Sequence, residues 1–347
     1  MRLVDRIAQC QTPFLVQDQT TRAVTRLNGA ADFATAVTLC PTRYVLDDDL
    51  IRLCTALAYS KGARSLVCTD LIHVPSKFVW VEWCESAWQS ELKNHGFRFG
   101  DGNQAGRGRH GALIQSAQSG RRGLIRTFWS TEETDTEVLA SSMEAYFDMD
   151  AEEGEEPAAP DEQSGTGVRV SDEAGGDADV LRRFFRFRYE RTWARYYDRA
   201  TISPLQRQAI ARHSLGTIAM AIPVLMAFFL LLATRTGLPQ RPQTMEKLNR
   251  LRIKARKPRL LDHVEVLSPM LSPMPAIDEP ALGGGLTGGR RGPRLHHVRG
   301  HLVRRGNQLF WRVPHLRGNA RSGQIRTRTV TWTFDRPAEQ SSPSRNA

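Results

Sequence analysis

Regularly spaced apolar residues predict several elements in the first 130 residues. Within 42–60, Leu50, Leu53 and Leu57 recur at three- and four-residue spacing after three aspartates, which is typical of an amphipathic helix with an acidic start. Three further segments are rich in β-branched and aromatic residues and are separated by turns containing Gly and Arg: 78–83, 111–115 and 124–129. Together these patterns predict a small antiparallel sheet packed on helices.

Apolar and basic residues alternate in the second half of the chain. From Val180 to Tyr197, aromatic residues recur at helical spacing between arginines. This spacing favours a helix that buries its aromatic rings and directs its arginines outward, and a nucleic-acid stacking surface is the alternative. A short basic helix is expected at 245–259, where Pro258 stops it, followed by a strand at 262–267.

The longest apolar run, 215–234, contains 20 residues without a charge. A run of this length is long enough to cross a bilayer. However, the run contains Gly216 and Pro223, it lacks flanking Trp or Tyr residues, and basic residues stand on both sides. These features favour a helix buried inside the fold, in which Pro223 marks a kink or a junction between two helices. A single membrane span is the alternative.

Acidic residues are concentrated in one part of a basic protein. The 347-residue chain carries a net charge of +11, but residues 132–179 hold 17 acidic residues and one basic residue, Arg169. Outside this insert, 47 basic residues face 20 acidic ones. Pro, Gly and Ser accompany the acidic residues, so we expect disorder at least over 150–178. A solvated linker is favoured over a tail that competes for the basic surface.

The chain length and the 40% of hydrophobic residues permit two domains of ordinary size. We predict an α+β fold with an N-terminal sheet, a helical middle with a long apolar core helix, and a basic β-meander at the C-terminal end. The predicted regions are 1–131 (α+β), 132–179 (acidic insert), 180–267 (helices and a strand), 268–293 (flexible Pro- and Gly-rich connection), 294–336 (β-meander) and 337–347 (disordered tail).

The predicted β-meander is the most basic part of the chain. It comprises strands at 297–303, 309–313 and 325–334, with a turn at Gly306-Asn307, and we expect it to pair with the strand at 262–267. Residues 241–336 hold 20 basic and 6 acidic residues, most of the basic ones arginine. Arginine favours bidentate phosphate contacts and base stacking. The candidate residues for binding nucleic acid or another anion are Arg299, His301, Arg304, Arg305, Arg312, His315, Arg317 and Arg321.

Three histidines raise the possibility of a metal site. His297 and His301 would face the same side of one strand, and His315 follows on the next part of the chain. A metal-dependent nuclease built on these histidines is therefore an alternative function. The segment lacks cysteines and a neighbouring pair of carboxylates, and the chain contains no nucleotide-binding or nucleophile motif. We therefore expect no metal, no cofactor and no catalytic residues, and favour a binding protein over an enzyme.

The cysteines indicate the cellular compartment. All five lie in the first 84 residues, their number is odd, and none forms a Cys-x-x-Cys motif. They are typical of small core residues in a reducing compartment. The first residues lack the apolar run of a secretory signal. We expect a cytoplasmic protein, with a membrane location as the alternative.

Three segments together resemble a family of phage proteins. They are the strand Trp80-Val81-Glu82-Trp83, the basic helix and strand over 247–266, and the terminal motif that begins at His297 and includes Phe310-Trp311-Arg312-Val313-Pro314-His315. In these segments the chain resembles the type V-A anti-CRISPR-like proteins of phages, prophages and plasmids. The resemblance implies a soluble, phage-derived protein of α+β type that acts inside a bacterial host. It also implies an apolar core helix and a role in blocking CRISPR interference, through the production of the effector or through its nucleic acid. It brings no catalytic residues.

The sequence thus predicts a non-enzymatic protein that binds RNA or a ribonucleoprotein through its basic C-terminal module. A host defence protein is a further possible partner. The oligomeric state is not indicated by the sequence.

Overall fold

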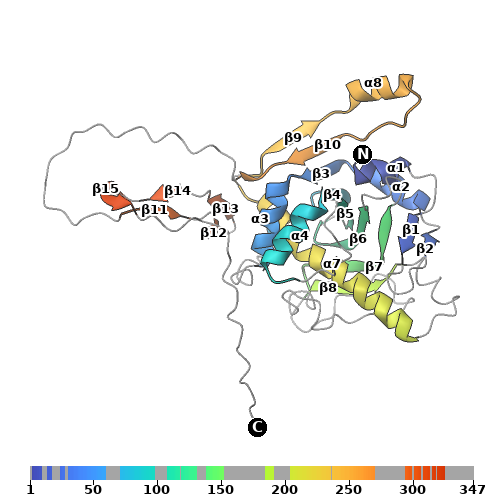
Figure 1. Ribbon diagram of the computed structural model, residues 1–347, viewed down its shortest axis with the longest axis horizontal. Coiled ribbons are helices and arrows are strands. Elements are labelled where there is room, and N and C mark those ends of the chain that lie inside the picture. Colours follow the sequence, from blue (N-terminus) through green and yellow to red (C-terminus); the bar gives the residue numbers. More distant parts are fainter. Residues whose placement is uncertain are drawn as a thin grey trace, which may run out of the picture.

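The computed structural model of the protein describes residues 2–9, 14–17, 24–27, 30–59, 71–97, 108–117, 119–130, 138–151, 184–190, 204–235, 237–269, 294–298, 301–305, 308–312, 315–317 and 319–324. These residues form an α+β fold, as predicted, with six helices and a mixed sheet of eight strands. Figure 1 shows the sheet in the centre, helices beside it, and a projection formed by β9, α8 and β10.

The central sheet has the strand order β8-β7-β6-β5-β4-β3-β10-β9. Its strands are β3 (Thr42–Leu46), β4 (Phe78–Cys84), β5 (Arg109–Ser116), β6 (Arg122–Ser130), β7 (Leu139–Asp148), β8 (Phe185–Tyr189), β9 (Gln240–Gln243) and β10 (His263–Val266). Strand β3 pairs in parallel with both β4 and β10, whereas the other pairs are antiparallel. The predicted strands β4, β5 and β6 are confirmed, but the sheet is mixed and larger than the predicted antiparallel one.

Helices cover both faces of this sheet. They are α1 (Leu3–Gln9), α2 (Ala30–Leu39), α3 (Asp48–Tyr59), α4 (Glu85–Asn94) and α7 (Pro204–Leu232). The sixth helix, α8 (Glu246–Lys254), buries no side chain and lies apart from the sheet, between β9 and β10 (Figure 1). Side chains on alternate positions of β4 enter different cores: Val81 and Trp83 pack with residues of α3, α4 and α7, and Trp80 packs with residues of α1 and α2. This follows from the two-residue period of a strand. Because both faces of β4 are covered, its sequence is a continuous apolar run interrupted only by Glu82.

The predicted helix after the three aspartates is α3. Asp47 precedes it and accepts a hydrogen bond at Oδ1 from the Leu50 backbone N–H, 2.6 Å away, as an N-cap residue does. Its other carboxylate oxygen accepts from the Ser268 N–H at 3.1 Å. Asp47 thereby connects the start of α3 to the end of β10.

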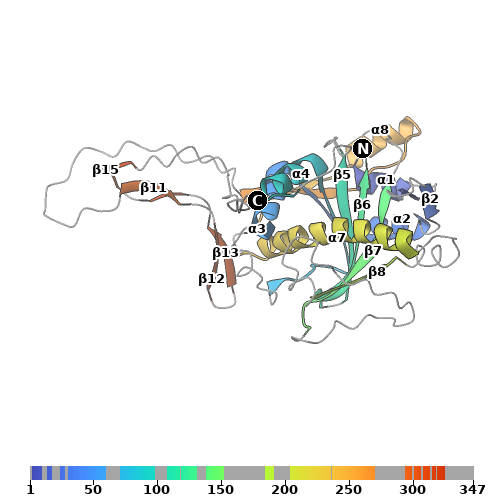
Figure 2. The ribbon, with the colours of Figure 1, turned by 60° about the horizontal axis from the view of Figure 1, so that its bottom comes forward.

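The apolar run forms the second half of α7. Among the helices that the structure describes, α7 has a segment long and apolar enough to cross a membrane, Leu215–Leu232, and 72% of this segment is buried inside the fold. Ile222 and Phe228 are fully buried in the larger core. In Figure 2, α7 lies across the sheet beside β7. The predicted core helix is confirmed, and Pro223 lies within one continuous helix, so the predicted alternative of a junction between two helices is wrong.

Two segments differ from the predictions. Residues 139–148, within the predicted acidic insert, form β7, whose apolar residues are buried against both cores. The predicted helix at 180–197 is wrong over 185–189, which form β8. There Phe185 and Phe187 are buried and Arg186 and Arg188 are partly exposed, so burial follows the period of a strand. Residues 152–178, for which we predicted disorder, lie outside the described residues.

The C-terminal strands form small separate sheets rather than one meander. They are β11 (Arg294–Val298), β12 (His301–Arg305), β13 (Gln308–Arg312), β14 (His315–Arg317) and β15 (Asn319–Gln324), and β12 pairs with β13 while β11 pairs with β14 and β15. The predicted pairing with residues 262–267 is wrong, because β3 and β9 already occupy the two edges of β10. A further hairpin joins β1 (Phe14–Gln17) to β2 (Val24–Leu27). The predicted strand at 325–334, most of the connection at 268–293 and the tail at 337–347 lie outside the described residues.

Two of the five cysteines are confirmed as core residues. Cys40 and Cys54 are buried and have free thiols, and Cys84 is half-buried. Burial raises the pKa of the Cys40 thiol to about 11, so the thiol is protonated at neutral pH. Cys10 and Cys68 lie outside the described residues.

A candidate anion-binding arm

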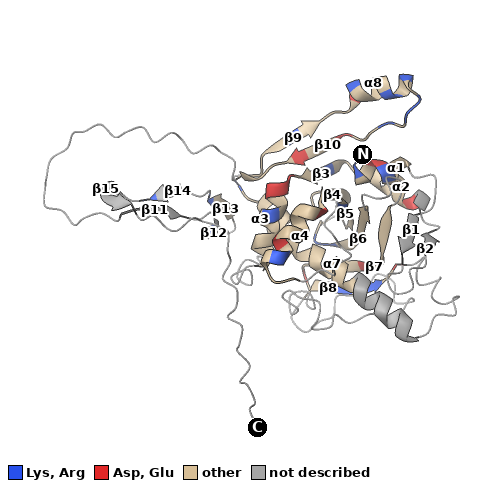
Figure 3. Ribbon diagram, viewed as in Figure 1, with Lys and Arg blue, Asp and Glu red and all other residues tan. Residues whose placement is uncertain are grey.

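A strongly basic surface in the described part of the chain belongs to residues 240–266, which we call the basic arm. Strands β9 and β10 pair antiparallel at the edge of the sheet and carry α8 away from the body of the protein (Figure 1). Residues 246–259 contain seven basic residues and one acidic residue. Helix α8 buries none of its side chains. Figure 3 shows the resulting concentration of basic residues on α8 and the segment after it.

Helix α8 presents its basic side chains in an ordered way. Lys247, Arg250 and Lys254 stand at positions i, i+3 and i+7 and so share one face of the helix. All three are exposed. Along the axis they span about 10 Å, which suits contacts with successive anionic groups. Arg250 forms an ion pair with Glu246, the one acidic residue of the helix.

Apolar side chains lie beside this basic face. Leu251 is 63% exposed, and Leu248 and Ile253 are also exposed. Together with the basic residues they give α8 a surface that is both cationic and apolar. Such a surface can contact the phosphates and also the sugars or bases of a single-stranded nucleic acid.

The C-terminal end of α8 contains an unusual backbone conformation. Arg256 has φ = 53°, in the left-handed region that normally favours glycine. The Arg256 N–H donates to the Ile253 carbonyl at 3.0 Å, and the Lys257 N–H donates to the Arg252 carbonyl at 2.8 Å. These two bonds form a Schellman motif, in which glycine is the usual residue at the position of Arg256.

The inner side of α8 is fixed to the rest of the arm by polar contacts. Asn249 exchanges two hydrogen bonds with the Leu260 backbone, at 2.8 and 2.7 Å. Arg252 donates from Nε to the Pro258 carbonyl at 2.7 Å. These contacts hold α8 against the segment that leads back to β10.

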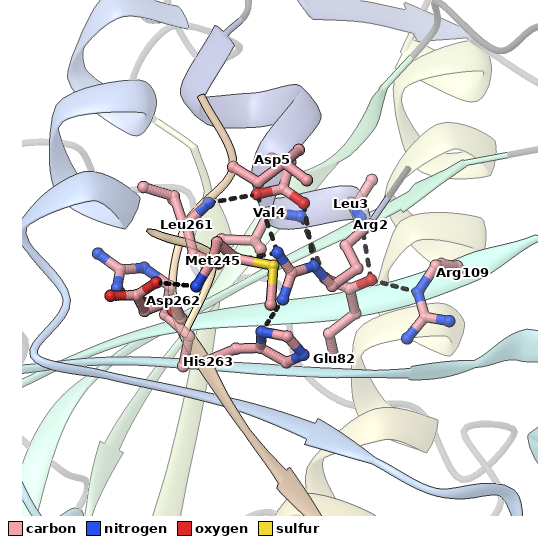
Figure 4. A network of polar contacts seen from close by, with 12 residues as sticks. Arg2, Leu3, Val4, Asp5, Glu82, Arg109, Met245, Leu261, Asp262 and His263 are labelled. Carbon is pink, nitrogen blue, oxygen red and sulfur yellow. Dashed lines mark hydrogen bonds and ion pairs between the residues drawn. The ribbon is translucent and has the colours of Figure 1, made fainter. Parts of the chain in front are cut away.

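The arm is anchored to α1 by a polar network, shown in Figure 4. Asp5 is 1% exposed and accepts hydrogen bonds from Arg2 Nε at 2.9 Å and from the Leu261 N–H at 2.8 Å. Arg2 also donates from Nη2 to the Leu261 carbonyl at 2.8 Å and from Nη1 to Nδ1 of His263. Because Nδ1 accepts, a neutral His263 ring carries its proton on Nε2.

The fully buried Glu82 supports this network from inside the sheet. Its carboxylate accepts from the N–H groups of Leu3 at 2.9 Å and Val4 at 3.1 Å, in the first turn of α1. Trp80 Nε1 donates to it at 3.1 Å, and Arg109 forms an ion pair with it through Nε. An anion at the N-terminus of a helix is stabilised by the free N–H groups and the helix dipole.

A neighbouring arginine, Arg43, also connects the arm to the body. It donates to the backbone carbonyls of Val37 at 2.9 Å and Asp262 at 3.3 Å. Burial lowers the pKa of Arg43, whereas the nearby Cys40, Asp262 and Asp5 raise it.

The structure places the predicted anion-binding residues on different strands. Arg304 and Arg305 on β12 and Arg312 on β13 are exposed on one hairpin, whose Leu309 and Trp311 are buried in the larger core. Arg317 is exposed on β14, in a separate sheet. His301, His315 and Arg321 lie on β12, β14 and β15, and their side chains are not described. Arg299 lies outside the described residues.

The three histidines of the predicted metal alternative are not placed on one strand. His297 lies on β11 and His301 on β12, which belong to different sheets, so the predicted shared face is wrong. His315 pairs with Val298 on β11. Within the ranges that the structure describes, no group of three His, Cys, Asp or Glu side chains could hold a metal ion.

The sequence did not predict the polar network that joins the basic arm to α1. Its members Arg2, Glu82 and Arg109 are far apart in the sequence, and only their tertiary contacts bring them together. One signal was present, since Glu82 is a charged residue inside an otherwise apolar strand. A buried charge requires partners, and those partners mark the network.

Comparison of the chain with protein-family models, curated proteins and solved structures found no match. The predicted resemblance to anti-CRISPR-like proteins therefore stays a prediction.

Proposed function

We propose that this protein is a non-enzymatic RNA-binding protein that contacts the RNA backbone through the basic arm. The observation that carries the proposal is the exposed basic face of α8, with Lys247, Arg250 and Lys254 on a helix that buries no side chain. So many cations on a projecting element repel one another unless anions neutralise them. The exposed arginines of the β12–β13 hairpin are a second set of contacts.

RNA is favoured over an acidic protein partner by the composition of the surface. Four of the seven basic residues in 246–259 are arginines, and exposed leucines lie beside them. Arginine binds phosphate bidentately and stacks on bases. The anti-CRISPR resemblance would place that RNA in a CRISPR effector, but the arm supports only the broader role of RNA binding.

The test is the affinity of the full chain for a single-stranded RNA, measured by fluorescence anisotropy at several salt concentrations. The triple variant Lys247→Gln, Arg250→Gln, Lys254→Gln should bind at least about tenfold more weakly. Its plot of log Kd against log salt should be shallower by about 2, because each lost phosphate contact removes about 0.7 from the slope on single strands. Equal affinities of the variant and the wild type would overturn the proposal.

Two single variants provide controls. Lys93→Gln removes an exposed charge from α4 in the body and should leave the affinity unchanged. Glu246→Gln removes the acidic partner of Arg250 and should tighten binding, because Arg250 is then free to contact phosphate. A DNA of the same sequence and a poly-glutamate peptide show whether the arm prefers RNA to other anionic polymers.

A further inference from the structure

A pocket of about 540 Å³ lies where the basic arm meets α1 and β5. Its lining residues come from three distant parts of the chain: Arg2, Asp5, Arg109, Met245, Arg252, Leu260 and His263. Figure 4 shows the side chains of Arg2, Asp5, Arg109, Met245 and His263 around this junction. The volume is within the usual range for a small-molecule site.

Two guanidinium groups in the lining have unused donors. Arg109 uses Nε for Glu82, and Arg252 uses Nε for the Pro258 carbonyl. Within the part of the chain that the structure describes, the terminal Nη1 and Nη2 atoms of both residues make no hydrogen bond. Each bond through Nε orients its guanidinium group. Two residues of the lining therefore carry pairs of N–H donors that make no hydrogen bond within the described part of the chain.

The charges around the pocket do not cancel. Arg2 is paired with Asp5, and Arg109 is paired with the buried Glu82. Arg252 has no carboxylate partner among the described residues. One positive charge is therefore left over, and a phosphate group, which carries about −1.5 to −2 at pH 7, would neutralise it.

We propose that this pocket binds the phosphate group of a nucleotide. Arg109 and Arg252 donate to the phosphate oxygens from the two sides of the junction. Met245 and Leu260 provide an apolar wall for the sugar or the base, and a proton on His263 Nε2 supplies one further donor. The phosphate can belong to a free nucleotide or to the end of a bound RNA. The lining residues are distinct from the outer basic face of α8, so the pocket does not depend on the proposed RNA contacts.

Calorimetry on the full chain tests the pocket without RNA. Adenosine 5′-monophosphate should bind saturably at one site, and adenosine should not bind. Arg252→Gln should weaken this binding at least about tenfold, whereas Lys247→Gln, on the same helix but outside the lining, should leave it unchanged. Wild-type protein that does not bind the monophosphate, or binding that Arg252→Gln leaves unchanged, overturns the proposal.

A second variant separates binding from folding, because Arg252 also holds the Pro258 carbonyl. Arg109→Lys keeps a cation beside the buried Glu82 but replaces the fork of two N–H groups with a single ammonium. It should keep the circular dichroism spectrum of the wild type and lose most of the affinity for the monophosphate. Unchanged affinity in a folded Arg109→Lys protein would contradict the assignment.

The source of the phosphate is decided by two RNAs of one sequence, one with a 5′-phosphate and one with a 5′-hydroxyl. If the pocket holds an RNA end, the phosphorylated RNA binds more tightly to the wild type but not to Arg252→Gln. If the pocket holds a free nucleotide, both RNAs bind equally and the monophosphate still binds at its own site. A protein that binds the monophosphate but neither RNA refutes the proposed function and leaves the pocket intact.

Discussion

Glu82 and Arg109 form an ion pair across neighbouring strands, with the glutamate fully buried and the arginine partly exposed at the root of the basic arm. The pair links the interior of the sheet to the surface, because Glu82 also accepts the first N–H groups of α1. Arg109 is also one of the residues that line the pocket. A substitution of Glu82 in the core of the sheet should therefore destabilise the contacts of both α1 and the basic arm.

Glu82→Gln tests this connection. The glutamine amide is neutral and has one acceptor oxygen, whereas the carboxylate has two. The amide therefore cannot accept hydrogen bonds from Arg109, Trp80 and both backbone N–H groups together. We expect the free energy of unfolding to fall by about 3–5 kcal/mol, the usual cost of breaking a buried pair. Urea denaturation measures this loss, and hydrogen exchange should show faster exchange at the amides of Leu3 and Val4.

Arg122→Gln is the matched control. It breaks an ion pair with Asp148 in which the arginine side chain is 54% exposed. Exposed pairs contribute little, so the loss should be below about 1 kcal/mol. If the two variants lose the same stability, Glu82 does not hold α1 in the way described.

The sequence predicted elements whose burial follows a simple period. Helix α3 was visible from Leu50, Leu53 and Leu57, and β4 was visible from its run of β-branched and aromatic residues. Strand β8 was missed because Leu181, Phe185 and Thr192 also fit a helical spacing. The tertiary pairing of β8 with β7 decides between the two periods, and local sequence does not contain that information.

The candidate site was predicted only in part. The basic helix α8 was expected from its charges and from Pro258, and the exposed arginines of the β12–β13 hairpin were among the predicted residues. The pocket was not expected, because Arg109 and Arg252 are 143 positions apart in the sequence. They line one pocket only because of the way the strands of the sheet are paired. The pairing of β10 with β3 brings the arm to α1, and no sequence pattern indicates a parallel pairing of this kind.

Arg256→Gly should separate stability from binding. The left-handed backbone at Arg256 costs about 1 kcal/mol for a residue with a side chain, and glycine adopts it without that cost. We expect the variant to unfold at a higher urea concentration and to bind RNA more weakly, because one cation of the arm is lost. Strained residues of this kind often serve a function.

Arg259→Gly is the control for this change. This substitution removes the same charge from the same segment, but Arg259 is not among the residues with positive φ. Glycine should therefore decrease stability there, by up to about 1 kcal/mol. A decrease in stability for Arg256→Gly would show that the backbone conformation at Arg256 is not as described.

Glu85→Gln should change the pH dependence of stability. Burial raises the pKa of Glu85 to about 7, against a hydrogen bond from Gln89 that lowers it. Between about pH 4.5 and pH 7 the folded protein holds a proton on Glu85 that the unfolded chain has lost. The free energy of unfolding therefore falls as the pH rises through this range. As the pH rises from 4.5 to 7.5, the free energy of unfolding of Glu85→Gln should increase by about 1–3 kcal/mol relative to that of the wild type.

The buried His110 has the opposite effect on the pH dependence of stability. Burial lowers its pKa to about 3, so between about pH 3 and 6.5 the unfolded chain holds a proton that the folded protein lacks. Its contribution therefore makes stability rise with pH over that range. Denaturation midpoints of the wild type, Glu85→Gln and His110→Phe from pH 4 to 8 distinguish the two groups. A pH-independent difference between Glu85→Gln and the wild type would show that Glu85 is not buried.

Two adjacent positions in α7 test whether this helix belongs to the core of the fold. Ile222 is fully buried, so Ile222→Ala should lower the free energy of unfolding by about 2–5 kcal/mol. Pro223 is partly exposed inside the helix and lacks the N–H that would bond the Ala219 carbonyl, so Pro223→Ala should preserve or increase stability. Thermal unfolding of the full chain in buffer without detergent measures both effects. If the wild type stays in solution only with detergent, or if Ile222→Ala leaves Tm unchanged, α7 is not a core helix and the membrane-span alternative gains support.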